Sequence, residues 1–180
     1  MRTFVAVEVC DKDALDSIVK LQSELQIKAS PVGRQNMHFT LLFLGEVAED
    51  VVEDVKKALS DIIFKPIQLN FTHLGAFPNP RFPRVIWIGV NEIAAAQLIE
   101  LARQVEQKIL PLGFKQDKPF KPHLTIFRVK NKENNMSDKI AKYSKIISIG
   151  KDTITELKLK QSVLTSNGPI YSDLLVVKAQ

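Results

Sequence analysis

Residues 38–44 read His-Phe-Thr-Leu-Leu-Phe-Leu, and residues 123–129 read His-Leu-Thr-Ile-Phe-Arg-Val. Both segments are rich in the β-branched and aromatic residues that favour strands. Because side chains alternate along a strand, the histidine and the threonine of each segment share one face, and the apolar residues between them share the other. The segments therefore predict two strands that bury one side and present a histidine and a threonine on the other.

Strand and helix patterns surround these two segments. We predict strands at residues 2–9, 38–44, 67–71, 84–90, 123–129, 153–164 and 170–177, and helices at residues 11–25, 51–63 and 92–110. Residues 77–83 form a proline-rich loop, and the polar residues 130–145 are expected to be a loop with a short helix. Since several strands follow one another directly, the order predicts an α+β fold with largely antiparallel sheets.

Size and composition indicate one globular domain. The chain has 180 residues and a net charge of +5, which favours anionic partners such as RNA, although a solvated lysine surface explains it equally well. Its single cysteine, Cys10, excludes an intramolecular disulfide, and we expect it to be a small buried apolar residue in a reducing compartment. No apolar run suits a signal peptide or a membrane span, so we expect a cytoplasmic protein.

The paired His-x-Thr motifs are the strongest functional signal. Two of the three histidines, His38 and His123, are followed two residues later by Thr40 and Thr125. Chance alone gives this in roughly 0.5% of chains of such composition. Hydrolysis of a phosphodiester needs one group to accept a proton from water and another to protonate the leaving oxygen, and histidine serves either role near neutral pH. Each threonine hydroxyl can donate a hydrogen bond to a phosphate oxygen.

Two other interpretations of the histidines stay open. Both can be partly buried structural residues that bond to the neighbouring threonines. They can also bind a metal with His73 as a third ligand, but neither motif holds a carboxylate, and a catalytic zinc normally has three protein ligands. His73 has no threonine two residues later, so we expect a structural role for it. We predict a site without a metal or another cofactor.

Positive charge beside the motifs would stabilise a phosphate. Arg128 follows His123 by five residues, and strict alternation puts it on the opposite face, so it reaches a phosphate only if the strand ends or bulges. Arg81, Arg84 and Lys121 flank the predicted strands, although each is better explained as a solvated charge.

Exposed aromatic rings would allow RNA bases to stack on the protein. Most of the phenylalanines are expected in the core, and Trp87 is expected to pack there too. The candidates for base contact are Phe77, Phe82, Phe120 and Tyr171.

The motifs resemble those of the 2H phosphoesterase superfamily, which is named for two His-x-Thr motifs. The wider pattern is similar to that of its RNA 2′,3′-cyclic phosphodiesterase branch, also called 2′-5′ RNA ligases. The matching pieces run from one end of the chain to the other: RTFVAVEV, HFTLLFLGEV, GAFPNPRFPRVIWIGV, LGFK, FKPHLTIFRVK and LKQSVLTSNGPIYSDL. One departure is Ile126, where this branch often has leucine, and we expect no change in chemistry because this side chain faces the core.

The resemblance implies a bilobal α+β fold over residues 1–180, a single domain with two mainly antiparallel sheets, flanking helices, pseudo-twofold symmetry and a central cleft. It also implies metal-independent hydrolysis of a terminal 2′,3′-cyclic phosphate to a 2′-phosphomonoester. His38 would be the proton donor to the leaving 3′ oxygen, and His123 the proton acceptor that activates water. The phosphate would be held by three residues, Thr40, Thr125 and Arg128.

Two other functions stay open. The same histidines can run the reaction in reverse as a 2′-5′ RNA ligase, although water at about 55 M favours hydrolysis in an open cleft. The chain can instead bind RNA ends without catalysis, and it would then tolerate histidine-to-asparagine changes. The expected partner is RNA or a nucleotide with a 2′,3′-cyclic phosphate end, and we expect a monomer that does not bind membranes.

Overall fold

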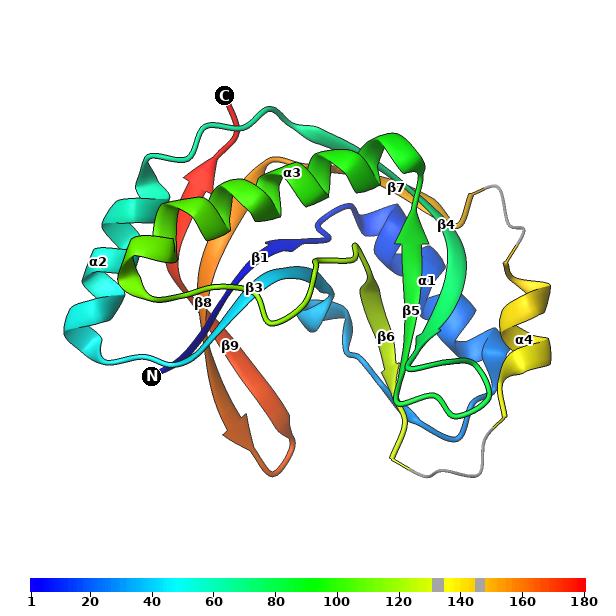
Figure 1. Ribbon diagram of the computed structural model, residues 1–180. Coiled ribbons are helices and arrows are strands. Elements are labelled where there is room, and N and C mark those ends of the chain that lie inside the picture. The colour runs from blue at the N-terminus through cyan, green and yellow to red at the C-terminus, as the bar shows by residue number, and fades with distance from the viewer. Residues whose placement is uncertain (131–134, 145–147) are drawn as a thin grey trace.

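The computed structural model describes residues 1–130, 135–144 and 148–180. These residues form two antiparallel sheets with helices packed against them, the α+β fold that the sequence predicts (Figure 1). In chain order the elements are β1 (Arg2–Glu8), α1 (Lys12–Leu25), β2 (Ser30–Pro31), β3 (His38–Glu46), α2 (Glu49–Ser60), β4 (Ile67–Phe77), β5 (Val85–Val90), α3 (Glu92–Ile109), β6 (Leu124–Arg128), α4 (Ser137–Lys142), β7 (Gly150–Ile154), β8 (Glu156–Thr165) and β9 (Gly168–Lys178), with short 3-10 helices at Arg34–Asn36 and Leu110–Leu112.

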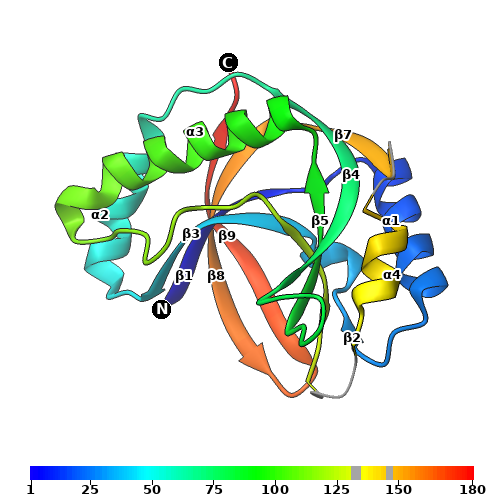
Figure 2. The ribbon, with the colours of Figure 1, turned by 45° about the vertical axis from the view of Figure 1, so that its right-hand side comes forward.

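The two strands that carry the His-x-Thr motifs lie in different sheets. Sheet A has the order β3-β1-β8-β9, and sheet B has the order β2-β6-β5-β4-β7. β3 is an edge strand of sheet A, and β6 is separated from the edge of sheet B only by the two-residue β2. β3 and β6, the strands that begin at the two motifs, contact each other across the two sheets (Figures 1 and 2).

One apolar core joins the two sheets. Phe39 of β3 and Phe71 of β4 are fully buried, and their rings stack with centroids 6.3 Å apart. α3 contacts β3 in sheet A and β4 in sheet B, while α1 packs on β6 and β7. Within the described residues, no helix has the length and apolar character to cross a membrane.

Some predicted boundaries were wrong. The strand predicted at residues 153–164 is two strands, because β7 pairs with β4 in sheet B while β8 pairs with β1 and β9 in sheet A. β4 extends to Phe77, well beyond the predicted residues 67–71. α2 ends at Ser60, so Ile63 lies outside the apolar stripe and is exposed.

Other segments were missed or fall partly outside the structure. The two-residue strand β2 is too short to leave a pattern in the sequence. The short helix expected within residues 130–145 is α4, while residues 131–134 and 145 of that segment lie outside the described residues.

Replacing Asp11 by alanine should lower the free energy of unfolding by about 1 kcal/mol. Asp11 is the N-cap of α1, and its carboxylate accepts a hydrogen bond from the Ala14 amide at 2.8 Å. Urea unfolding measures the loss, and Asp11→Ser is the control because serine also caps. A serine variant as destabilised as the alanine variant would show that capping is not the cause.

Candidate active site

His38 and His123 occupy matching places at the starts of their strands. His38 is the first residue of β3. His123, which was predicted to begin its strand, directly precedes β6. Nδ1 of His38 lies 2.8 Å from the carbonyl oxygen of Asn36, and Nδ1 of His123 lies 2.6 Å from that of Lys121. Since a carbonyl oxygen only accepts, each Nδ1–H donates, and each Nε2 is left to exchange a proton.

A β-bulge follows the threonine on β6. Thr125 and Phe127 pair with adjacent residues of β5, so Ile126 between them has no partner on that strand. Ile126 and Phe127 are both buried, and the alternation then resumes one residue out of step. Arg128 is therefore exposed on the same face as Thr125, not on the opposite face that strict alternation predicts.

The same bulge follows the threonine on β3. Thr40 and Leu42 pair with adjacent residues of β1, which leaves Leu41 without a partner there. Leu41 and Leu42 are both buried, and Phe43 is 64% exposed. Phe43 thus occupies on β3 the place that Arg128 occupies on β6. Sequence reasoning missed it, although the aligned motifs put the two residues at the same distance from their histidines.

Two aromatic rings flank His38. The His38 ring lies 5.1 Å from that of Phe4 and 5.3 Å from that of Tyr171, measured between centroids, and the contact with Tyr171 is edge-to-face. Tyr171, predicted as a base contact, is therefore beside a histidine. Phe4 is buried and was not singled out by its sequence context.

Two aromatic rings also flank His123. Its ring lies 5.0 Å from that of Phe77 and 6.3 Å from that of Trp87. Trp87 lies over Gly75, where an added Cβ would come within 2.2 Å of the indole. Trp87, expected to be simple core packing, is thus part of the surroundings of His123. Its Nε1 is buried and has no hydrogen-bond partner among the described residues.

Burial favours the neutral form of both histidines. Desolvation lowers the pKa of His38 to about 4, against the opposing effect of the Asn36 carbonyl. Desolvation likewise lowers the pKa of His123. The positive charge of Arg128 also contributes to the lowering of both pKa values, because a cation disfavours the charged imidazolium.

A charged cluster lies beside His38 on sheet A. Glu8 is the cross-strand partner of His38, and its carboxylate binds the ammonium groups of Lys158 and Lys160. Both lysines also bind Asp173, and Lys160 is 4% exposed. Partial burial alone would raise the pKa of Glu8 and of Asp173, but the lysines outweigh it and hold both below their usual values. The cluster was not found from the sequence, because its members are up to 165 residues apart.

The remaining candidates from the sequence are three cations and His73, whose ring lies 5.7 Å from that of Trp87. Arg81, Arg84 and Lys121 are exposed, and within the described part of the chain none forms an ion pair. His73 packs over Gly89, and its Nδ1 lies 2.9 Å from the Thr72 hydroxyl. Among the described residues, no three histidine, cysteine or acidic side chains are grouped as metal ligands.

The aromatic candidates divide into two kinds. Phe82 is exposed, and the guanidinium of Arg81 lies 5.4 Å above its ring. Phe120 is half-buried and packs against the core. Of the rings predicted for base contact, Phe77 and Tyr171 are therefore the two that touch the histidines.

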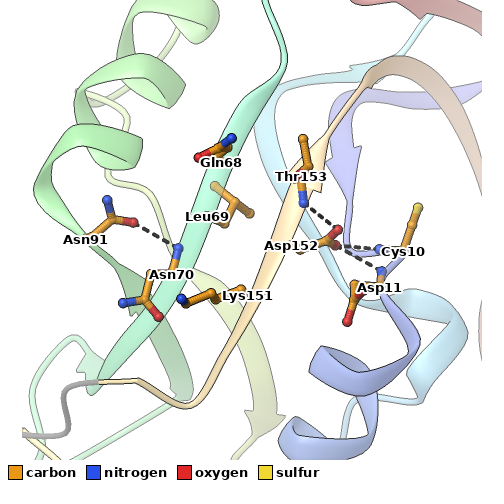
Figure 3. A pocket seen from close by; sticks show the side chains of 9 residues that line it. All are labelled: Cys10, Asp11, Gln68, Leu69, Asn70, Asn91, Lys151, Asp152 and Thr153. Atoms are coloured by element: carbon orange, nitrogen blue, oxygen red, sulfur yellow. Dashed lines mark hydrogen bonds between the residues drawn. The ribbon is translucent and has the colours of Figure 1, made fainter.

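A pocket of about 700 Å³ lies away from the histidines, between β4, β7 and the start of α1 (Figure 3). It contains none of the predicted site residues. Cys10, expected to be buried, is exposed at its edge, and its amide donates to Asp152 at 2.7 Å. Desolvation and the charge of Asp152 raise the pKa of the Cys10 thiol, which opposes its use as a nucleophile.

Comparison with known proteins gives a match along most of the chain. The LigT like phosphoesterase family matches twice, over residues 7–87 and 88–171, and each half contains one His-x-Thr motif. The chain is 46% identical to the RNA 2′,3′-cyclic phosphodiesterase of Archaeoglobus fulgidus, over 98% of this chain and 99% of that protein. It is 36% identical to the protein of the same name from Methanocaldococcus jannaschii, over 95% and 96%.

Solved structures share the fold. TT0787 of Thermus thermophilus has a TM-score of 0.81 and 26% identity, over 99% of this chain and 97% of that one. E. coli LigT in complex with 3′-AMP also has a TM-score of 0.81, at 22% identity and the same coverage, which supports the fold alone.

Both imidazoles should titrate below their ordinary pKa of 6.5, and His38 at about pH 4. In this range the unfolded chain binds protons that the folded chain does not, so the free energy of unfolding should fall as the pH drops from 6.5 toward 4. Imidazole NMR and urea unfolding at several pH values measure both effects. The free energy of unfolding of His38→Phe should depend less on pH than that of the wild type. A His38 pKa above 6.5 would contradict the expected lowering by burial.

Proposed function

The chain belongs to the LigT-like phosphoesterase family, and on this premise we propose that it is an RNA 2′,3′-cyclic phosphodiesterase whose chemistry is carried by His38 and His123. The supporting observation is the matched pair of strands. Each presents a histidine whose Nδ1 binds a carbonyl, followed by a threonine and a bulge, and the two strands contact each other. Relatives at 46% and 36% identity bear the name of this activity.

The proposed reaction transfers one proton at each histidine. His123 takes a proton from water at Nε2 as the water oxygen attacks phosphorus. The bond between phosphorus and the 3′ oxygen breaks, and His38 gives its Nε2 proton to that oxygen. The product is a 2′-phosphomonoester with a free 3′ hydroxyl, and no metal takes part. Burial favours neutral His38, so the anionic phosphate of the substrate is what favours its charged, proton-donating form.

Three residues are proposed to hold the phosphate. Thr40 and Thr125 share the faces of their histidines, where their hydroxyls can donate to non-bridging oxygens. Arg128 is on the same face because of the bulge, and it has no ion-pair partner among the described residues. A guanidinium there neutralises charge that develops on the phosphate oxygens.

Aromatic rings around the histidines favour a nucleoside substrate. We assign base stacking to Phe43, which is 64% exposed, contacts Phe4 beside His38 and occupies the place that matches Arg128. Stacking is tolerant of base identity, which suits an enzyme that acts on RNA ends of different sequence.

Ligation in the reverse direction uses the same two proton transfers and remains the second candidate. Hydrolysis is favoured because water is in large excess over any RNA hydroxyl. In both histidines Nδ1 binds a backbone carbonyl, which leaves Nε2 available for proton transfer. A protein that only bound RNA ends would not need this arrangement at two histidines.

His38→Asn and His123→Asn should each lower kcat by about 10²- to 10⁴-fold, because asparagine neither donates nor accepts a full proton. The assay is hydrolysis of adenosine 2′,3′-cyclic phosphate with EDTA present. Lys57→Asn is the control, since Lys57 is exposed on α2, where it pairs with Asp54. Full activity in either of the first two variants would exclude the mechanism and favour an RNA-end binder.

Arg128→Ala should lower kcat/KM by about 10²-fold, the usual cost of removing one donor that stabilises transition-state charge. It should also raise the pKa of both histidines, because the charge that it removes lowers them. Arg103→Ala is the control, since Arg103 binds Glu100 on α3. An unchanged kcat/KM in Arg128→Ala would show that this guanidinium does not contact the phosphate.

A further inference from the structure

Each bulge residue has a backbone carbonyl that accepts a hydrogen bond from a glutamine side chain. Nε2 of Gln22 on α1 donates to the carbonyl of Ile126 at 2.8 Å and to that of Val32 at 3.0 Å. Nε2 of Gln116, in the loop before β6, donates to the carbonyl of Leu41 at 3.3 Å. Ile126 and Leu41 are the two residues that the bulges leave without a partner on β5 and β1.

The arrangement is reciprocal between the two matched halves of the chain. Gln22 belongs to residues 7–87 and supports the bulge in residues 88–171. Gln116 belongs to the second half and supports the bulge in the first. The same type of donor, a glutamine side chain, therefore binds the same acceptor, the carbonyl of the bulge residue, at two separate sites.

Gln22 uses both hydrogens of its amide in this contact. It is half-buried on α1, and its two acceptors join α1, the segment after β2 and β6. The amide of Val32 also donates to the carbonyl of Ile126, at 2.9 Å. The bulge of β6 is therefore held from two sides, and the side-chain amide of Gln22 is the part that a point substitution can remove.

The bulge decides which way Arg128 faces. If β6 paired with β5 without the extra residue, strict alternation would turn Arg128 toward the core face, as the sequence alone predicts. The carbonyl of Ile126 would then sit differently relative to α1, and Gln22 would lose its acceptor. A donor fixed at this carbonyl therefore favours the register in which Arg128 shares the face of Thr125 and His123.

We propose that Gln22 and Gln116 are positioning residues of the hydrolysis, which act by holding the bulges that turn Arg128 and Phe43 to the strand faces that carry the two histidines. This inference deepens the proposed function and rests on it. Gln22 makes two contacts, one of them at 2.8 Å, and Gln116 makes one at 3.3 Å, so the larger effect is expected at Gln22.

A double-mutant cycle of Gln22 and Arg128 tests the proposal. Methionine at position 22 keeps the length of the side chain and removes the donor. With adenosine 2′,3′-cyclic phosphate, Gln22→Met should lower kcat/KM by about tenfold, the scale of a small misplacement of a catalytic contact. In an Arg128→Ala background the same change should have an effect within about twofold of none. A tenfold loss in both backgrounds would overturn the proposal, because Gln22 would then act independently of Arg128.

Two controls separate positioning from general damage. Gln104→Met removes a glutamine of α3 that binds Glu100, and it should leave kcat/KM unchanged. Gln22→Asn keeps the amide but shortens its reach, and it should retain more activity than Gln22→Met. Thermal unfolding checks that each variant is folded. If Gln22→Met does not fold, the cycle of Gln116→Met with Phe43→Ala takes its place and is read in the same way.

Failure of the proposed function gives a different result. If the wild type hydrolyses no cyclic phosphate, the same cycle is measured as the affinity for adenosine 2′-monophosphate by calorimetry. Non-additive losses of affinity at Gln22 and Arg128 would support the positioning role, and additive losses would reject it.

Discussion

The β-bulge after each threonine is the constraint on which the arrangement of the site depends. A regular strand turns every second side chain to the same face, so a residue five places after the histidine would face the core. One unpaired residue, Ile126 on β6 and Leu41 on β3, reverses this alternation. Arg128 and Phe43 are exposed as a result, and the buried pairs next to them keep both strands anchored in the core.

The two halves of the chain depend on each other. Sheet A combines β3 from the first matched half with β8 from the second, and sheet B combines β4 from the first with β6 and β7 from the second. α1 packs on sheet B, and α3 contacts both sheets. Neither histidine strand therefore has its full surroundings in one half, and one apolar core joins the two halves.

The environments of the two histidines break the symmetry of their motifs. Both Nδ1 atoms face a carbonyl two residues earlier, so the local geometry is the same. His38 has the charged cluster of Glu8, Lys158, Lys160 and Asp173 beside it, where Glu8 raises its pKa and Lys160 lowers it. His123 instead lies against Phe77 and Trp87. Surroundings that differ in this way can separate the pKa values of two identical groups and so favour opposite roles in one reaction.

The α+β class and the paired His-x-Thr motifs can be predicted from the sequence alone, which also indicates the four residues of those motifs as the candidate site. These features are local, because the periodicity of apolar residues belongs to a single helix or strand, and the histidine and threonine of each motif are only two residues apart. The sequence did not determine the side of the sheet on which Arg128 lies, the division of residues 153–164 between two sheets, or the neighbours Trp87, Phe43 and Glu8. These features depend on tertiary contacts, since a bulge is defined by the pairing of two strands and a charge cluster by residues far apart in the chain.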